Sequence, residues 1–473
     1  MCFFMAAWFA SGVVLIYVPF PSLSSAERLD RAGDVDTSDL KLSPADAIRS
    51  HGGKQVIERI RLVARAGRPL YLVQDRGQKV SAIWGDDGSQ AVLDLEEGVR
   101  DIAAQFSGEA VRQIDGPIEY DQWVVHQGFD TERPYMRVQM DDSAGTVLYI
   151  SQSSGEVLQR TTRSQRGWNY VGAVVHWIYP TALRRHWATW DQVVWWLSLA
   201  GIVVVMLGIF LGFDHMIKAL RSTPRKINAY QGWMKWHHVL GLLASVFVLT
   251  WIFSGWLSMD HGRLFSMPDP TAQQLDRFRG MSLTEASQNV SVHSISRLGS
   301  FRELEIKSIA ATPVMIVRSR DKQDIYPVSS SRQAFAGGVL PKSLVQEGVK
   351  AAWPEYTIQS VEEMRLEDVY RQVRQNELPM STIRVKLDDP AETWVHVDAA
   401  SGEIASVMDR SRRLYRWLYN GLHSLDFPGL TEHRPLWDII ILSLLTLGFI
   451  FSSTGAYLGI RRLKRSFTQR TPD

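Results

Sequence analysis

Histidines that recur in register are the residues of this chain best suited to hold a redox metal. When residue n is set beside residue n+247, His176 matches His423 and His186 matches His433. The chain contains 12 histidines, and no other two coincide at this offset. A haem iron takes two axial imidazoles, one on each face of the ring, and two repeat-related helices can supply them from opposite sides. The register therefore predicts a bis-histidine haem site.

The residues alone leave open which of the two pairs binds the iron. Pro180 interrupts one copy and Pro428 the other, each between the two histidines of its copy. The first histidine of each copy is therefore expected on a short segment at the membrane interface. The second is expected near the start of a long apolar helix.

A second histidine site is expected at the opposite end of the apolar segments, where His237 and His238 begin one of them. Successive helical residues point about 100° apart, so only one of the two can face the neighbouring helices. The repeat-related position lies before Met1. We therefore expect the natural chain to begin further upstream, with another histidine there. The alternatives are that this site is lost or that His215 serves it.

Four arginines lie just outside the apolar segments and also coincide at the repeat offset. They are Arg163, Arg166, Arg410 and Arg413. Guanidinium groups form charge-assisted hydrogen bonds with carboxylates and phosphates. We expect them to hold haem propionates or an anionic ligand, with lipid phosphates as an equal alternative. The sequence assigns no catalytic residue.

The histidines and arginines belong to a long internal repeat. Residues 137–212 align with residues 384–459 without a gap, and Ser154-Gly155-Glu156 falls on Ser401-Gly402-Glu403. Trp8 to Gly12 falls on Trp251 to Gly255 at an offset of 243. A repeat of this length defines the architecture. Each half is expected to be a membrane helix, an outer domain and a second membrane helix, and the pseudo-twofold axis to follow the membrane normal.

Apolar segments at 1–20, 190–213, 237–258 and 437–460 are each about 20 or more residues long, enough to cross a bilayer. Alternating runs joined by turns at Asp141-Asp142 and Asp388-Asp389 predict hairpins between them. The expected fold is a membrane α-helical four-helix transmembrane bundle with two α+β domains. Gly208-xxx-Gly212 and Gly455-xxx-Gly459 predict close helix packing.

The predicted boundaries follow from these segments. The helices are 1–20, 186–213, 236–259 and 431–460; the outer domains are 21–185 and 260–430; the basic inner segments are 214–235 and 461–473.

Orientation follows from the basic residues beside the apolar segments. Lys218, Arg221, Arg225, Lys226 and Lys235 lie in one short connection, and the C-terminal tail contains Arg461, Arg462, Lys464, Arg465 and Arg470. Lys and Arg concentrate on the cytoplasmic side of a membrane. Both termini are therefore expected in the cytoplasm, and the large domains on the outer side of the membrane.

Composition excludes several classes of protein. The net charge of the 473 residues is +2, which indicates no nucleic-acid partner. A single cysteine, Cys2, excludes a disulfide framework and a CxxCH haem attachment site. There is no Rossmann glycine pattern after a strand and no P-loop. Any electron donor must therefore be a separate molecule, which the sequence does not identify.

The chain resembles the PepSY-associated transmembrane family of bacterial inner-membrane proteins. The resemblance is carried by Trp236-His237-His238-Val239-Leu240-Gly241, by Val397-Asp398-Ala399-Ala400-Ser401-Gly402-Glu403, and by Leu422-His423. It implies one or two b-type haems and reduction of ferric siderophores. It also favours His176 with His423 over His186 with His433, and His237 over His238.

Two functions remain open at the level of sequence. The first is a haem protein of the inner membrane that passes electrons outward to a ferric siderophore or other ferric chelate. The alternative is a non-enzymatic membrane-anchored PepSY module that binds peptides or regulates a protease. Both place the protein among membrane lipids, and the paired histidines favour the first.

Overall fold

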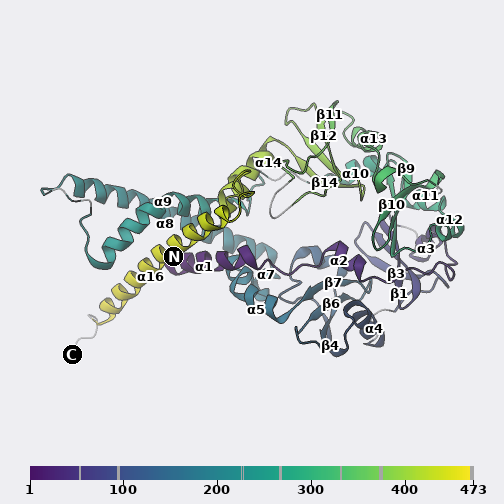
Figure 1. Cartoon of the computed structure of the whole chain (residues 1–473), viewed down its shortest axis with the longest axis horizontal. Helices are drawn as coiled ribbons and strands as arrows, with labels where there is room; N and C mark the ends of the chain where they lie inside the picture. Colours follow the sequence, from purple (N-terminus) through teal and green to yellow (C-terminus); the bar gives the residue numbers. More distant parts are fainter. Residues whose placement is uncertain are drawn as a thin grey trace. The chain divides into compact units, whose positions relative to one another are not determined.

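The computed structural model describes residues 1–52, 55–92, 96–224, 226, 228–265, 269–330, 333–371 and 377–468. Arg225 and Arg470, two of the basic residues used for orientation, lie outside these ranges. The chain forms two compact units (Figure 1). Residues 21–163 and 267–410 form the strand-rich unit, and residues 1–20, 164–266 and 411–473 form the helical unit. The helical unit carries the histidine pairs.

The strand-rich unit is built around one antiparallel sheet to which both halves of the repeat contribute. Its strand order is β10-β9-β8-β1-β2-β3. The strands are β1 (Ile57–Arg65), β2 (Arg68–Asp75), β3 (Val80–Trp84), β8 (Glu303–Ile309), β9 (Thr312–Arg318) and β10 (Gln323–Pro327). Ile60 on β1 lies opposite Ile306 on β8. Two equivalent three-stranded meanders thus join at β1 and β8 into a single sheet.

Each half also has a four-stranded antiparallel sheet of its own, in the orders β4-β5-β6-β7 and β11-β12-β13-β14. The strands are β4 (Val111–Ile118), β5 (Tyr135–Met140), β6 (Val147–Ser151), β7 (Val157–Thr161), β11 (Ile358–Glu363), β12 (Thr382–Leu387), β13 (Trp394–Asp398) and β14 (Glu403–Met408). Asp142 and Asp389 close the β5–β6 and β12–β13 turns by accepting hydrogen bonds from Thr146 and Thr393. The predicted hairpins are confirmed.

Short helices cover these sheets. They are α2 (Ser25–Asp30), α3 (Pro44–Ser50), α4 (Glu96–Ser107), α10 (Ala272–Arg279), α11 (Leu283–Gln288), α12 (Val292–Ser296) and α13 (Lys342–Ala352), with 3-10 turns at Gln127–Glu132, Val328–Ser330 and Ala336–Gly338. Ser43 caps α3 and Pro44 is its first residue, a position where proline is favoured. The repeat-related helices α4 and α13 bury Val99 and Val349 in the cores beneath the two four-stranded sheets.

The helical unit contains the long apolar helices α8 (Trp187–Leu220), α9 (Gly232–Leu257) and α16 (Leu436–Thr468), together with α1 (Cys2–Tyr17). Helix α1 packs along α16 and α9 along α8, and α9 also contacts α16. Phe9, Trp251 and Trp437 are buried between them. Short segments complete the unit: α5 (Arg163–Val171), α6 (Ala173–His176), α7 (Thr181–Arg184), α14 (Arg410–Tyr415), the π-helical turn η4 (Arg416–Gly421) and α15 (Leu422–Ser424).

The predicted fold class is wrong. In the described part of the chain, three helices rather than four are long and apolar enough to cross a membrane: α8, α9 and α16. Helix α1 ends at Tyr17, before Pro19 and Pro21, and 16 residues span about 24 Å, less than a hydrocarbon core of about 30 Å. The rest is a mixed α and β protein with three antiparallel sheets, not two appendages on a four-helix membrane bundle.

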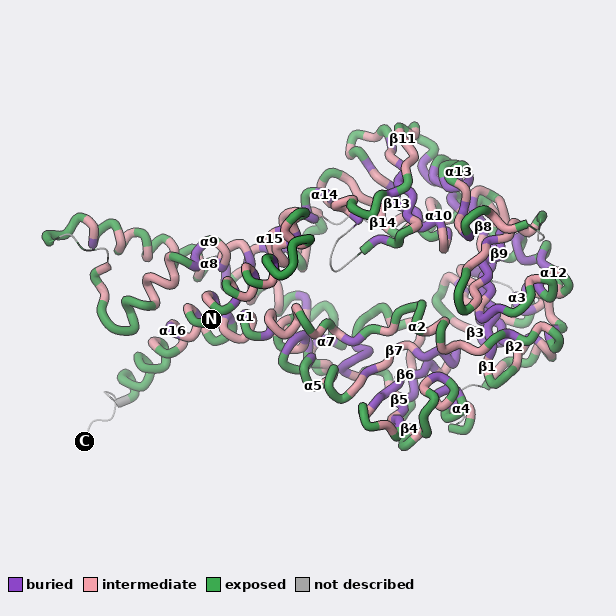
Figure 2. The backbone as a smooth tube through the Cα atoms, viewed as in Figure 1, coloured by how far each residue is buried: buried purple, intermediate pink, exposed green. Residues whose placement is uncertain are grey.

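Many residues of the three long helices are exposed, whereas strands such as β2 and β6 are largely buried (Figure 2). Only 17% of the most apolar stretch of α8 is buried, and the values for α9 and α16 are 33% and 28%. Water-soluble proteins rarely expose apolar surface on this scale. The exposure therefore fits helices whose outer faces contact lipid.

Candidate functional site: a paired-histidine centre

The structure brings His176 and His423 together within the helical unit. Their ring centroids are 6.2 Å apart and the ring planes are inclined at 72°. Two imidazoles on opposite sides of one metal ion have centroids about 6 Å apart, because each metal–nitrogen bond is about 2 Å and each nitrogen is about 1 Å from its ring centre. The spacing therefore fits one metal ion between the two rings.

A non-α segment precedes each of these histidines and sets its position. In the first copy, Gly172 separates α5 from α6, and a Cβ there would lie 2.9 Å from a methyl group of Val14 on α1. In the second copy, the π-helical turn η4 comes directly before α15. Departures of this kind from α geometry often occur at functional sites. Here each of them ends within four residues of the histidine.

Matching hydrogen bonds orient the two rings. Nδ1 of His176 lies 3.1 Å from Oγ of Ser11 and 3.2 Å from the carbonyl oxygen of Trp8. Nδ1 of His423 lies 3.0 Å from Oγ of Ser254. Both serine hydroxyls donate to the carbonyl of the tryptophan three residues earlier, at 3.0 Å. The two copies therefore hold their rings in the same way.

These contacts determine where the proton of each imidazole lies. A carbonyl oxygen only accepts hydrogen bonds, so Nδ1 of His176 donates to Trp8. The hydroxyl proton of each serine is used on a tryptophan carbonyl, so the serine oxygen accepts from Nδ1. The second ring nitrogen, Nε2, then carries the free lone pair. A histidine that ligates a metal commonly donates its other N–H to a carbonyl or hydroxyl in this way.

Burial keeps both rings neutral, which is the form that binds metals. It lowers the pKa of His176 to about 4, and the nearby His423 contributes to the same shift. Burial also lowers the pKa of His423 below its ordinary value. Tyr419 stacks on the His423 ring, with centroids 5.5 Å apart. The pair is therefore two neutral, oriented and partly buried imidazoles.

The alternative pair does not come together in the described structure. His186 and His433 are both exposed. His186 accepts a hydrogen bond from Arg185 at 3.1 Å, and Nδ1 of His433 contacts the carbonyl of Gly429. No contact between the two rings is recorded among the residues described. Of the two alternatives that the sequence left open, His176 with His423 has the geometry of a metal site.

His237 and His238 differ in how their ring nitrogens are used. His238 has both occupied, Nε2 by the carbonyl of Gly212 at 2.9 Å and Nδ1 by Asn228 at 3.0 Å. His237 uses Nδ1 toward Thr454 Oγ1 at 3.0 Å and stacks on Phe451. His237 is therefore the better candidate of the two. His215 is exposed and packs edge-on against Tyr230.

The four arginines are divided between the two units. Arg163 and Arg410 are the last residues of the two segments of the strand-rich unit, and both are exposed. Arg410 forms an ion pair with Glu392. Arg166 is half-buried and Arg413 is buried, both in the helical unit. Their assignment to haem propionates, an anionic ligand or lipid stays a prediction.

Sequence reasoning missed the serines that orient the histidines. Ser11 and Ser254 occupy the same place in the repeated Trp-x-x-Ser-Gly segments, and that match was visible. What it did not reveal is that each serine faces a histidine 165 or 169 residues away along the chain. No group of three or more His, Cys, Asp or Glu suited to a metal is present among the described residues.

Comparison with protein-family models gives no match, and comparison with curated proteins gives none either. The PepSY-associated resemblance therefore stays a prediction carried by the residues quoted for it. The argument for function depends on the geometry of the histidine pair.

Proposed function

We propose that this protein binds a b-type haem between His176 and His423 and passes electrons across a bacterial inner membrane to a ferric chelate. The 6.2 Å spacing of two repeat-related, neutral imidazoles carries the proposal. A porphyrin would supply four nitrogen donors to its iron, and His176 and His423 would hold that iron through Nε2 of each ring. The site provides two such ligands, the imidazoles of His176 and His423.

The chain's own residues would perform three tasks around such a group. Ser11 and Ser254 fix the orientation of the imidazoles and make Nε2 of each the ligating atom. Burial keeps both rings unprotonated at neutral pH. When bound, a haem supplies one-electron oxidation and reduction at a potential set by its axial ligands and by the polarity around it.

The proposed orientation has the C-terminus in the cytoplasm and the strand-rich unit in the periplasm. Both termini in the cytoplasm would need an even number of spans, and the described residues contain three. Support comes from the basic residues beside α8 and at the end of α16, since Lys and Arg concentrate on the cytoplasmic side. Helices α8, α9 and α16 would contact lipid. His237 is the candidate ligand for a second haem at the inner end. The electron donor would be a separate molecule, and a ferric siderophore is the proposed acceptor.

The test is the absorption spectrum of the full chain purified in detergent, before and after dithionite. The wild type is expected to show the sharp bands of a reduced b-type haem, and reoxidation by ferric nitrilotriacetate should restore the oxidised spectrum. H176A and H423A should each remove the bands of this haem. H186A and H433A are matched controls in the same repeat register, and they should keep them.

Two results would overturn the proposal. A colourless wild-type protein would leave the non-enzymatic binding module as the better account. A haem spectrum that survives H176A and H423A unchanged would place the iron elsewhere in the chain.

A further inference from the structure

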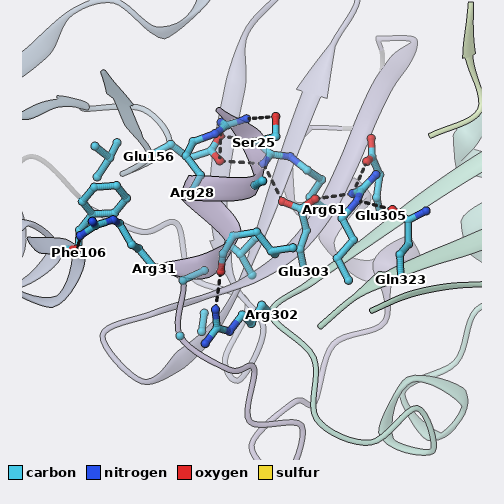
Figure 3. A pocket seen from close by; sticks show the side chains of 18 of the residues that line it. Ser25, Arg28, Arg31, Arg61, Phe106, Glu156, Arg302, Glu303, Glu305 and Gln323 are labelled. Carbon is cyan, nitrogen blue, oxygen red and sulfur yellow. Dashed lines mark hydrogen bonds and ion pairs between the residues drawn. The ribbon is translucent and has the colours of Figure 1, made fainter. Parts of the chain in front are cut away.

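A cavity of about 560 Å³ lies in the strand-rich unit, against the middle of the six-stranded sheet. Its walls come from β1, β8 and β9, from helices α2 and α4, and from the turns before β7 and β14 (Figure 3). Pockets that bind small molecules have volumes of about 300–1,000 Å³. The cavity is therefore large enough for a metabolite-sized ligand.

The two Ser-Gly-Glu turns of the repeat both reach this cavity. Glu156 follows β6 and Glu403 begins β14, and both line the wall. Glu156 pairs with Arg61 on β1, and Glu403 pairs with Lys307 on β8. Both copies of the repeated Ser-Gly-Glu motif thus lie at the same cavity. The haem proposal gives these turns no role.

The charges of the lining do not balance. Seven arginines and five carboxylates line the cavity. Arg61 is held by Glu156 and Glu303, and Arg318 by Glu303 and Glu305. Glu156, Glu303 and Glu305 are therefore already engaged in ion pairs, as Figure 3 shows around Arg61. The surplus positive charge belongs to arginines of the first half.

Arg65 and Arg31 are the arginines without a carboxylate. The guanidinium of Arg65 donates to the carbonyl of Ala64 at 2.9 Å, and its Nε is buried without a hydrogen-bond partner. Arg31 donates to the carbonyl of Phe106 at 3.0 Å and lies over the Phe106 ring. No ion pair to either is recorded in the described structure. Burial lowers the pKa of Arg65, and the charges of Glu156 and Glu303 only partly offset that effect.

Unpaired guanidinium groups beside apolar side chains define the kind of ligand that fits. A guanidinium presents a planar fork of donors that matches a carboxylate in bidentate fashion. Val63, Ala64, Ile102 and Phe106 also line the cavity and suit a carbon skeleton. We infer that this cavity binds a small organic anion with two or more carboxylates, held by Arg65 and Arg31. The inference is independent of haem binding.

The test is calorimetric titration of the full chain in detergent with citrate, at ionic strength held constant with sodium chloride. Wild-type protein should bind citrate saturably. Arg65→Met keeps the bulk of the side chain and removes the charge, so affinity should fall at least tenfold. The matched control is Arg68→Met: Arg68 pairs with Asp86 and Asp87 and is not part of the lining, so its loss should leave affinity unchanged.

The stability of Arg65→Met separates ligand binding from a structural role. If Arg65 is kept for a ligand, removing an unpaired buried charge should leave the thermal midpoint without citrate at least as high as in the wild type. Arg31→Met should also weaken citrate binding, and it serves if Arg65→Met does not fold. The inference fails if wild type binds no citrate saturably, if both variants bind it as tightly as wild type, or if inorganic phosphate binds equally well.

Discussion

Glu156 and Glu403 show how one residue of a repeat acquires two different environments. The side chain of Glu156 is 9% exposed and pairs with Arg61, whereas that of Glu403 is 61% exposed and pairs with Lys307. Burial by itself raises the pKa of Glu156, but the charge and hydrogen bonds of Arg61 outweigh it and hold that pKa well below its ordinary range. Glu156 is therefore a buried ion, and Glu403 a solvated one.

Neutralising the two carboxylates should have very different effects. Glu156→Gln leaves Arg61 buried with one carboxylate fewer, and breaking a buried ion pair costs about 3 kcal/mol of unfolding free energy. Glu403→Gln breaks an exposed pair and should cost less than about 1 kcal/mol. Thermal unfolding of the two variants in detergent measures the difference. Equal losses would mean that the Arg61 pair is no stronger than a surface contact.

The candidate histidines could be predicted from the sequence because the internal repeat identifies pairs of residues at equivalent positions. Two lone histidines carry little information, but two at one offset imply equivalent positions near a common axis. The register alone could not choose between His176 and His186. That choice depends on the backbone geometry of Gly172 and of η4, which position the two histidines. The periodicity of apolar residues does not predict such departures from α-helical geometry.

At the scale of helices, the repeat predicts close packing, and the structure shows it at two of the four expected glycines. A Cβ built on Gly212 would lie 3.1 Å from Leu242, and one on Gly455 would lie 2.7 Å from Sγ of Cys2. A Cβ built on Gly208 or Gly459 meets no described atom within 4 Å. Further tight approaches occur at Gly201, where Ile252 would clash with such a Cβ, and at Gly448, where the Phe9 ring lies 2.6 Å away. Phe9 and Ile252 are repeat-related residues. Helix α1 therefore packs on α16 as α9 packs on α8.

This packing can be tested with one substitution at two glycines of the same helix. Gly448→Ile should force the Phe9 ring away from α16, and overpacking of this kind costs about 2 kcal/mol. Gly459→Ile introduces the same side chain where there is space, so the intrinsic helix cost cancels in the comparison. The melting midpoint in detergent should fall for the first variant only. A similar fall in both would assign the effect to helix propensity.

Helix existence was easier to predict than helix length. The apolar segments gave α8, α9 and α16 to within a few residues at their outer ends, because polar and aromatic residues flank them. Residues 1–20 were counted as a span, yet the helix there ends at Tyr17. Pro19 lacks an amide hydrogen and disfavours helical geometry in the residue before it. Apolar composition alone does not predict that the helix ends at Tyr17.

At the scale of the whole molecule, the halves are joined by strand pairing that the sequence did not indicate. Alternation of apolar residues predicted the hairpins, but it does not say which edge strand pairs with which. β1 and β8 meet with Ile60 opposite Ile306, so the repeat-related meanders complete one sheet. Arg59 with Glu305 and Arg61 with Glu303 form ion pairs across this seam.

The seam should be the part of the molecule most sensitive to acid. Burial by itself raises the pKa of Glu305, but Lys307, Arg59 and Arg318 outweigh it and lower that pKa well below its ordinary range. A carboxylate whose pKa is lowered in the folded state stabilises it at pH above about 4.3, and that contribution shrinks as pH falls further. The core around Trp251 and Trp437 is apolar and gains nothing from these ions.

Hydrogen exchange can compare the two regions in one sample. After incubation at pH 3.5 or pH 6 and pulse labelling at one common pH, amides of β1 and β8 should lose protection in the acid sample. Amides in the middle of α9 and α16 should keep theirs. The Glu156→Gln variant should show a smaller difference between the two incubations, since one of the titrating groups is gone. Loss of protection in α9 before β1 would show that the ion pairs do not limit stability in acid.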